Sequence, residues 1–351
     1  MTARVPAASD PSSVTVSDFT ERELIDRIQQ HLPPQPPWMI VGIGDDAAVV
    51  EPERNRVEVL TVDAIVEGVH FDRRFVPAEA IGHRALAVNL SDLAAMGAAP
   101  RLALLSFALP SRFPVADFDG ILNGLAALAA RYRMHIAGGN LSRTTGPLVV
   151  DVTAIGSVKR RQALTRGGAK AGDALYVSGT IGGAVAGLQM LSATRPTMED
   201  QETGVASSMS AAAERYLYPE PRVRLGMLLA RNRAASACMD VSDGLADAVR
   251  QMARASLVGV AIDAAALPID AGARAWFQSR GSDAVAESMA SDDYELLVAA
   301  RPRNGRRLAS AVQHAGVTLT RIGFCTPERA VVIRRDGVES PLPAGYTHFG
   351  R

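Results

Sequence analysis

The stretch Asp240-Val241-Ser242-Asp243-Gly244 follows a short apolar strand and precedes a helix expected over residues 243–255. A strand, a tight turn and a helix start place both carboxylates of this stretch on one rim, and such units are typical of α/β proteins. With Ser242 as its N-cap, the helix would keep backbone amides available for an anion. Capping by Ser242 and Asp243 alone is the simpler interpretation, but it leaves Asp240 unexplained.

The rest of the chain alternates short apolar stretches with helical patterns. Turn residues that bound apolar runs predict strands, and cap residues with helical spacing predict helices. The predicted strands are residues 39–41, 47–50, 57–62, 102–109, 149–155, 174–177, 258–262, 295–299 and 330–333. One predicted helix begins at Thr20, and a second follows Pro77 and ends at Gly97. Three more helices are predicted at residues 118–132, 223–231 and 243–255. This order predicts an α/β (α+β) fold.

The length of 351 residues predicts two domains. Residues 1–18 are rich in Ser, Thr, Ala and Pro and are expected to form a disordered tail. The first domain is then expected over residues 19–158. The second is expected over residues 159–351, starting at the basic stretch Lys159-Arg160-Arg161.

Charge, hydropathy and cysteine content exclude several classes of protein. The 37 basic and 37 acidic side chains balance, which argues against nucleic acid or an anionic membrane as the main partner. No apolar run approaches the roughly 18 residues that a membrane-spanning helix needs. Cys238 and Cys325 lie far apart and suggest neither a disulfide framework nor a zinc site, so a reducing cytoplasm is the expected location.

Six aspartates fall at strand ends, in turns or on an inward helix stripe: Asp45, Asp46, Asp63, Asp92, Asp240 and Asp243. Asp92 shares its stripe with Ile81, Ala85 and Val88, so it is expected to face inward. Carboxylates gathered in a pocket repel one another and lose hydration unless a hard cation compensates. Magnesium with nucleotide phosphates is the commonest such partner. Taken singly, each aspartate is better explained as a turn former or helix cap; the set favours a metal site.

Three other features could contact a ligand. Ser178–Gly183 has the glycine content of a phosphate-binding loop but lacks the lysine and spacing of a Walker motif. Arg166 could clamp a phosphate with its planar fork, although a solvated arginine is the default interpretation. His70 could bind substrate, although a lone histidine beside an apolar residue is more often packed. No serine or cysteine sits in a nucleophile elbow, so covalent hydrolysis is unsupported.

Seven separated motifs resemble those of the thiamine-monophosphate kinase family, in the family's order and from about residue 19 to the C-terminus. They are Gly42-Ile-Gly-Asp-Asp46, Val66-Glu-Gly-Val-His-Phe71, Ala87-Val-Asn-Leu-Ser-Asp-Leu-Ala-Ala-Met-Gly97, Ala163-Leu-Thr-Arg166, Asp240-Val-Ser-Asp-Gly244, Asp293-Tyr-Glu-Leu296, and Gly345-Tyr346 with His348-Phe349.

The resemblance implies a two-domain fold of the aminoimidazole ribonucleotide synthetase type, with an N-terminal mixed sheet used in dimerisation and a C-terminal α/β sandwich. It implies a homodimer with ATP and several Mg²⁺ ions bound between the halves. By similarity, Asp46, Thr61, Asp63, Asp92, Asp240 and Asp243 would hold metal, Asn140, Arg166 and Ser242 would contact ATP, and His70, Asp292 and Tyr346 would face the substrate.

The implied activity is ATP-dependent phosphorylation of thiamine monophosphate to thiamine diphosphate by direct in-line transfer. A phosphate monoester has a second pKa of about 6, so the acceptor is mostly a dianion at neutral pH and needs no general base. Two alternatives stay open. One is another ATP-dependent chemistry on the same scaffold, such as amide activation or ring closure. The other is a nucleotide-binding regulator whose catalysis has lapsed.

Five positions depart from the family pattern, and three of them, Val62, Asn140 and Ser291, motivate the second alternative. Asn140 stands where the family usually has aspartate, and Val62 stands where it commonly has threonine. Ser291-Asp292 replaces Gly-Glu, and Thr347 replaces aspartate. These changes bear on the number of metal ions and on the acceptor more than on ATP binding.

Overall fold

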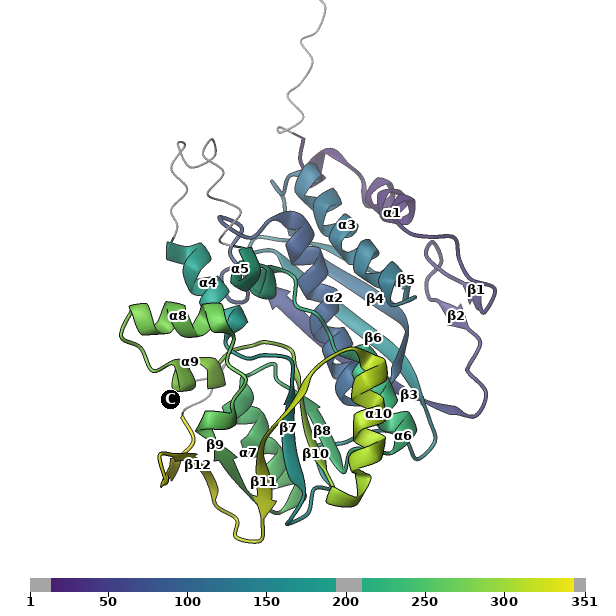
Figure 1. The fold of residues 1–351 in the computed structure, drawn as a ribbon. Coiled ribbons are helices and arrows are strands. Elements are labelled where there is room, and N and C mark those ends of the chain that lie inside the picture. Colours follow the sequence, from purple (N-terminus) through teal and green to yellow (C-terminus); the bar gives the residue numbers. More distant parts are fainter. Residues whose placement is uncertain (1–13, 194–209, 344–351) are drawn as a thin grey trace, which may run out of the picture. The chain divides into compact units, whose positions relative to one another are not determined.

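The computed structural model describes residues 14–193 and 210–343 (Figure 1). These residues form two compact units. The described part of the first unit is residues 14–52, Val62–Leu86 and Leu102–Thr153; that of the second is Glu53–Thr61, Ala87–Arg101, and residues 154–193 and 210–343. The chain thus passes between the units several times, whereas we expected one boundary between residues 158 and 159. That single boundary stays a prediction.

Most elements of the first half match the predicted strands and helices. They are η2 Val16–Asp18, α1 Glu21–Gln30, β1 Met39–Val41, β2 Val49–Val50, β3 Arg56–Val66, α2 Ala78–Ala95, β4 Ala99–Pro110, α3 Val115–Arg131, β5 His135–Thr144 and β6 Val149–Lys159. The predicted start of α1 at Thr20 is confirmed by a capping box: the Thr20 side chain accepts from the Glu23 N–H group, and the Glu23 carboxylate accepts from the Thr20 N–H group.

The second half contains seven strands and seven α-helices among the described residues. They are β7 Ala174–Ser178, α4 Gly183–Ala193, α5 Ser210–Leu217, α6 Val223–Asn232, β8 Ala237–Asp240, α7 Leu245–Ser256, β9 Gly259–Asp263, η4 Ala264–Ala266, α8 Ala271–Ser279, α9 Ala284–Met289, β10 Leu296–Ala300, η5 Pro302–Asn304, α10 Gly305–Ala315, β11 Leu319–Thr326, β12 Val331–Arg335 and β13 Val338–Pro341.

The expected N-terminal tail is wrong for its last residues. Residues 1–13 lie outside the described part, but Val16 is buried and donates from its backbone N–H group to the Phe113 carbonyl at 2.9 Å. Thr15 forms a bridge with Pro114 at the start of α3. The contact buries an apolar side chain and satisfies a backbone donor, which explains why order begins before Phe19.

Two sheets supply the frame. One has four strands in the order β3-β6-β4-β5, and its β4 and β5 run parallel with Leu102 opposite His135 and Pro110 opposite Thr144. The other has seven strands in the order β13-β12-β9-β11-β7-β10-β8, antiparallel except for the parallel pair β12 and β9. This confirms a mixed α/β fold.

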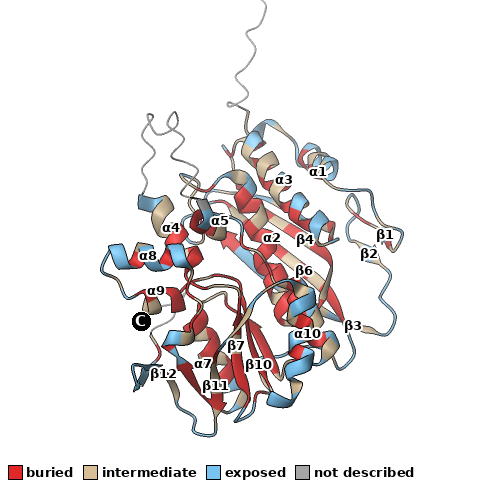
Figure 2. Cartoon of the chain, in the orientation of Figure 1, coloured by how far each residue is buried: buried red, intermediate tan, exposed pale blue. Residues whose placement is uncertain are grey.

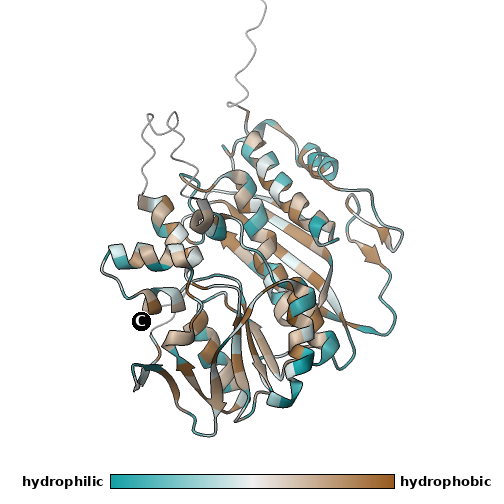
Figure 3. Ribbon diagram, viewed as in Figure 1, coloured by the Kyte–Doolittle hydropathy of each residue, from teal (hydrophilic) through white to brown (hydrophobic). Residues whose placement is uncertain are grey.

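The core of the second unit lies under the middle of the seven-stranded sheet. All five residues of β10 are buried, and β7 and β10 are red in Figure 2. The same strands are mainly brown in Figure 3, because they consist largely of Leu, Val and Ala. Helix α7 packs its buried residues Leu245, Val249 and Met252 into this core.

Helix α2 is buried far beyond the predicted stripe. Ile81, Ala85 and Val88 are buried as expected, but so are Asn89 and Ser91, each at 0% exposure. A helix enclosed on most sides carries polar residues only where they have partners or a function. None of the helices in residues 14–193 and 210–343 is both long enough and apolar enough to cross a membrane.

Candidate active site

Two carboxylates that are 148 positions apart in the sequence lie near each other at the second half of α2, Ala87–Ala95, which belongs to the second unit. Asp240, the last residue of β8, is only 4% exposed. Its Oδ2 atom accepts a hydrogen bond from Ser91 Oγ on α2 at 2.9 Å. Asp92 is the next residue on the same helix. The fold therefore brings these two predicted metal ligands to one place, and Ser91, which sequence reasoning assigned no role, joins them.

Asp92 in turn is contacted from strand β3. Thr61 Oγ1 donates a hydrogen bond to Asp92 Oδ2. Arg166 lies close enough for its charge to act on Asp92, because the Leu164 N–H group donates to the Met96 carbonyl just beyond α2. The Arg166 guanidinium also donates to Gln251 on α7. Thr61, Asp92, Arg166 and Asp240 thus converge within the second unit.

The electrostatics of this cluster favour a bound cation. Burial raises the pKa of Asp92, while the hydrogen bond from Thr61 and the charge of Arg166 lower it by less. Burial, and then the negative charge of Asp240, raise the pKa of the nearby Cys238 thiol. Both carboxylates are therefore desolvated, and a cation that shares them would offset that desolvation.

The turn after β8 differs from the prediction in its cap. The N-cap of α7 is Gly244, not Ser242, and the helix starts at Leu245. Gly244 has φ +91°, and a Cβ atom at this position would lie 2.7 Å from the Met289 carbonyl oxygen, so only glycine fits. Ser242 and Asp243 then occupy the turn itself, half-buried, between Asp240 and the helix.

The first unit carries the other two predicted metal ligands. Asp46 is exposed in the loop after β1, where its N–H group donates to Asp45 Oδ1 at 2.8 Å. Asp63 is exposed on β3. The five aspartates are thus divided, two in the first unit and three in the second. Within residues 14–193 and 210–343, no group of three or more His, Cys, Asp or Glu side chains is arranged to hold a metal ion.

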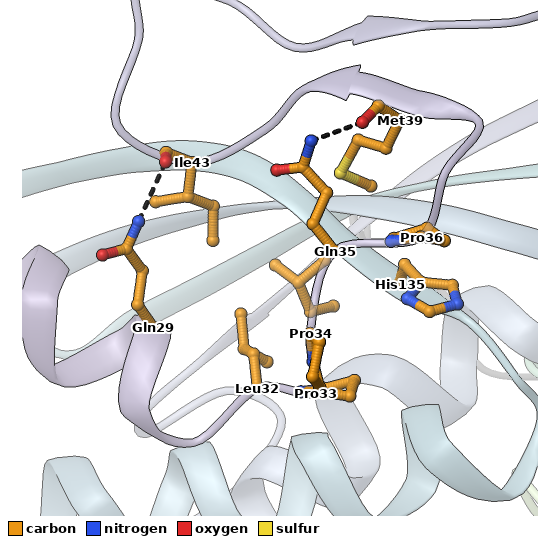
Figure 4. Close-up of a pocket in the computed structure, with 10 residues that line it drawn as sticks. Gln29, Leu32, Pro33, Pro34, Gln35, Pro36, Met39, Ile43 and His135 are labelled. Atoms are coloured by element: carbon orange, nitrogen blue, oxygen red, sulfur yellow. Dashed lines mark hydrogen bonds between the residues drawn. The ribbon is translucent and has the colours of Figure 1, made fainter.

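A pocket of about 320 Å³ borders the Asp45–Asp46 loop within the first unit (Figure 4). It lies between the end of α1, the proline-rich turn and the start of β5. Its lining comprises Gln29, Leu32, Pro33, Pro34, Gln35, Pro36, Met39, Ile43, His135 and Ile136. Gln29 Nε2 donates to the Ile43 carbonyl at 2.8 Å, and so ties the aspartate loop to α1. The apolar and amide lining suits a flat, uncharged group.

Asn140 and His70 have defined hydrogen bonds in the first unit. Asn140 is exposed on β5, and its Nδ2 donates to Ser142 Oγ at 2.9 Å. His70 is half-buried, and its Nδ1 accepts from the Val66 N–H group at 3.0 Å. A neutral ring that accepts at Nδ1 carries its proton on Nε2.

The glycine-containing loop at Ser178–Gly183 is not a phosphate site. Asp293, whose side chain is fully buried, accepts from the Gly182 N–H group at 2.6 Å and the Ala184 N–H group at 2.9 Å. Ser291 Oγ accepts from the Val185 N–H group at 3.1 Å. The amides at the start of α4 are therefore occupied by the protein itself. Ser291, a departure from the family pattern, has a capping role here.

Glu295 anchors the same region through two arginines. Arg222 donates from Nε and Nη2 to its two carboxylate oxygens, at 2.7 and 2.5 Å. Arg215 lies 3.2 Å from Glu295 and 3.5 Å from Asp293, and Ser178 Oγ also donates to Glu295. This network was missed from sequence. The motif Asp293-Tyr-Glu295 was recognised, but its arginine partners lie more than 70 positions away.

The remaining predicted substrate residues are less defined. Asp292 is half-buried beside Asp293, and its negative charge contributes to raising the pKa of Asp293. The next residue, Tyr294, has φ +54°, a left-handed conformation that turns the chain sharply between Asp293 and Glu295. Tyr346 lies outside the described residues.

Comparison with known proteins assigns a class to this fold and site. Residues 44–158 match the N-terminal domain of AIR synthase related proteins, and residues 170–336 match the C-terminal domain of the same proteins. The chain therefore has both domains of that class, as the motifs predicted.

Relatives that match nearly the full length of this chain identify its family within that class. Thiamine-monophosphate kinase of Bacillus subtilis (strain 168) is 35% identical, over 88% of this chain and 93% of that protein. The crystal structure of thiamine-monophosphate kinase from Stenotrophomonas maltophilia K279a is 36% identical with a TM-score of 0.79, over 92% of this chain and 98% of that one. AaThiL complexed with AMPPCP and TMP is 29% identical with a TM-score of 0.72, over 96% and 99%. The chain belongs to the thiamine-monophosphate kinase family.

Proposed function

We propose that this chain is an enzyme that uses ATP to phosphorylate thiamine monophosphate to thiamine diphosphate. The observation that carries the proposal is the convergence of Thr61, Asp92, Asp240 and Arg166 from four separate segments of the second unit. Family membership supplies the reaction, and a relative with bound AMPPCP and TMP supports both ligands.

The reaction needs charge neutralisation more than proton transfer. An oxygen of the acceptor phosphate attacks the γ-phosphorus of ATP, the bond from that phosphorus to the bridging oxygen breaks, and ADP leaves with the electron pair. Because the acceptor is already mostly a dianion, no side chain has to remove a proton. Arg166 would offset the repulsion between the two anions, and Ser242 would donate its hydroxyl hydrogen to ATP.

The donor set fits magnesium by its chemistry. Asp46, Thr61, Asp63, Asp92, Asp240 and Asp243 offer carboxylate and hydroxyl oxygens, which hard cations prefer over nitrogen or sulfur. Bound Mg²⁺ would polarise the transferred phosphoryl group. Asn140 keeps its Oδ1 atom as an acceptor while its Nδ2 group donates to Ser142. An amide oxygen can replace the carboxylate usual in the family, although with less charge.

The thiamine phosphate would be held by His70, Asp292 and Tyr346. His70 Nε2 would donate to the phosphate, because the Val66 N–H group fixes the tautomer from the other side of the ring. Asp292, on its sharply turned segment, would accept from the cationic or amino part of the substrate.

The pocket in Figure 4 would take the base of the nucleotide. Ile136 lines it, and Asn140 follows four residues later on the same strand, roughly 13 Å away at the usual rise per residue. A nucleotide with its base against Leu32 and Ile43 could then reach Asn140 with its phosphates.

Two further expectations concern assembly and location. Leu60 and Val62 are 65% and 58% exposed on one face of β3, at the end of the four-stranded sheet. Neighbouring exposed apolar side chains often mark an interface, so we place a homodimer contact there. Val62→Glu should yield a monomer by sedimentation, and Val338→Glu, at an equally exposed valine, should not. Both cysteines are free and buried, which agrees with the predicted reducing cytoplasm.

The direct test is incubation with ATP, Mg²⁺ and thiamine monophosphate, followed by separation of the products. Thiamine diphosphate should form in equal amount to ADP, and Asp240→Asn should remove both. ADP release that an amide substrate stimulates and thiamine monophosphate does not would favour another chemistry on this scaffold. Binding of ATP with no thiamine diphosphate at any enzyme concentration would favour the lapsed regulator.

A further inference from the structure

Four arginines surround a second pocket in the second unit, which lies just before the start of β8, whereas the proposed ATP-binding residue Ser242 follows the end of that strand. The pocket has a volume of about 530 Å³ and lies where the segment after α6 meets η5 and the start of α10. Its lining is Arg233, Ala235, Ser236, Arg301, Arg303, Asn304 and Arg307. We propose that it is a binding site for a small anion that carries two linked phosphoryl groups.

The charges in this pocket are not neutralised by the protein. No acidic residue lines it, and none of its four guanidinium groups has an ion-pair partner among residues 14–193 and 210–343. Other arginines of the chain do have one: Arg27 pairs with Asp119, Arg222 with Glu295, and Arg335 with Asp283. Because the whole chain has no net charge, this concentration of cations is local and not a result of a basic composition.

The backbone around the pocket is fixed by side-chain hydrogen bonds. Asn304 Nδ2 donates to the Ala234 carbonyl at 3.2 Å, and Asn232 Nδ2 donates to the Arg307 carbonyl at 3.5 Å. Ser236 Oγ donates to Asp173 and to the Ala299 carbonyl, so its hydroxyl is satisfied away from a ligand. Helix α10 also packs against α6 (Figure 1). The arginines therefore project from a rigid frame.

Helix α10 adds to the positive potential. It has 11 residues, and its N-cap Asn304 makes no side-chain capping hydrogen bond. The Gly305 N–H group donates to the Pro302 carbonyl of η5, and the next amides of the first turn point toward the start of α10, which carries Arg307 and follows Arg303. This start is hydrophilic in Figure 3. A helix N-terminus and guanidinium forks both favour phosphate oxygens.

The number of cations and the shape of the pocket select the ligand class. A single phosphate monoester carries about −1.5 to −2 charges at neutral pH, which matches two arginines better than four. A second phosphoryl group would engage the others. Single-stranded nucleic acid usually binds through aromatic side chains that stack on its bases, and no aromatic residue lines this pocket. A compact diphosphate fits these observations better than an RNA strand.

The test is calorimetric titration of the full chain with inorganic pyrophosphate in EDTA, so that metal-dependent binding elsewhere is suppressed. The variants are Arg303→Gln/Arg307→Gln and a control with the same loss of charge, Arg54→Gln/Arg329→Gln, at exposed arginines outside the pocket. Affinity should fall at least tenfold in the pocket variant and less than twofold in the control. Inorganic phosphate should bind at least tenfold more weakly than pyrophosphate.

Three results would overturn the proposal. Equal losses in both variants would show a general charge effect, and equal affinity for phosphate and pyrophosphate would exclude a two-phosphoryl site. Loss of binding to a single-stranded RNA oligonucleotide alone, with pyrophosphate unaffected, would assign the surface to nucleic acid. Kinase turnover should persist in Arg303→Gln/Arg307→Gln, so this outcome is separate from that of the proposed function.

Discussion

The second unit contains two pairs of carboxylates, three of them buried and Asp92 half-buried, with opposite surroundings. Asp293 and Glu295 receive arginine side chains and, for Asp293, helix amides. Asp92 and Asp240 receive hydroxyls from Thr61 and Ser91, with the charge of Arg166 acting on Asp92. The first pair is neutralised by the protein and holds the fold together. In the second pair, two hydroxyl groups orient the carboxylates, and a bound cation would add the positive charge that buried carboxylates need.

This comparison shows why an acidic motif is a poor guide to function until its partners are known. Asp293-Tyr-Glu295 and Asp240-Val-Ser-Asp243 both stand beside buried strands of the same sheet. Their contacts distinguish the pair that anchors the fold from the pair that we propose binds the cation. Substitutions should therefore affect stability at one pair and turnover at the other.

The largest effect is expected at Asp92. Asp92→Asn should lower kcat at least 1000-fold, about 4 kcal/mol in activation free energy, because the group proposed to bind the cation loses its charge. Burial raises the pKa of this carboxyl, so the uncharged amide should leave the free energy of unfolding unchanged or higher at pH 7. Steady-state kinetics and urea unfolding measure the two quantities.

Asp151→Asn is the matched control for Asp92→Asn. Burial also raises the pKa of Asp151, on β6, but no site role is proposed for it. This variant should keep its turnover. If both variants lose activity to the same degree, the assignment of Asp92 to the cation site is wrong.

The second effect is the loss of stability at Glu295. Glu295→Ala leaves two partly buried arginines, Arg215 and Arg222, without this partner, and should destabilise the protein by about 3–5 kcal/mol. Urea unfolding measures the change. Glu339→Ala breaks an exposed pair with Arg334 and should change stability by less than about 1 kcal/mol. Similar changes in the two variants would mean that Glu295 does not anchor the network.

The third effect depends on pH and concerns Asp293. Burial raises the pKa of Asp293 from 3.8 to about 6, so between these values the folded protein binds more protons than the unfolded chain. The stabilisation from this proton is complete below pH 3.8 and is lost as the pH rises through 6; it amounts to about 3 kcal/mol.

Asp293→Asn provides the measurement for this pH dependence. Asparagine does not titrate, so the difference in unfolding free energy between wild type and variant should grow as the pH falls from 7 to 4.5. Chemical unfolding at a series of pH values tests the expectation. A difference that stays constant over this range would refute a raised pKa at Asp293.

The smallest effect is expected at Thr61. Thr61→Val removes the hydroxyl that donates to Asp92 and should lower kcat/KM about tenfold, roughly 1.4 kcal/mol, without unfolding the protein. Thr61→Ser keeps a donor and should recover most of this loss. Equal activity of the valine and serine variants would indicate that the hydrogen bond has no part in catalysis.

The sequence predicted many helices and strands correctly in the segments where local residue patterns determine the structure. Strand β1 has the predicted bounds, and the stop of α2 before Gly97 was also correct. Strand β5 was missed because its end, Gly138–Arg143, is polar and glycine-rich. Its pairing with β4 comes from the sheet, not from its own alternation of apolar residues.

The sequence pointed to Asp92 and Asp240, which the fold brings near each other, but it did not predict their contacts. Motif spacing identified Asp92 and Asp240, yet Ser91, which connects them, carries no signal beyond its place beside Asp92. The Ser178–Gly183 loop resembled an anion site because glycine content is local, whereas the carboxylate that fills it lies 110 positions later. Contacts between distant segments depend on the assembled fold, which local patterns do not encode.

The two native thiols have a practical consequence for labelling. Cys238 and Cys325 are each 1% exposed, and burial raises the pKa of Cys325 to about 11. Alkylating reagents attack the thiolate, which is both scarce and shielded here. In an Ala235→Cys variant, a thiol-reactive fluorophore would therefore label the new cysteine at the rim of the arginine pocket and leave both native thiols unlabelled. Its emission would report the binding of an anion in the pocket.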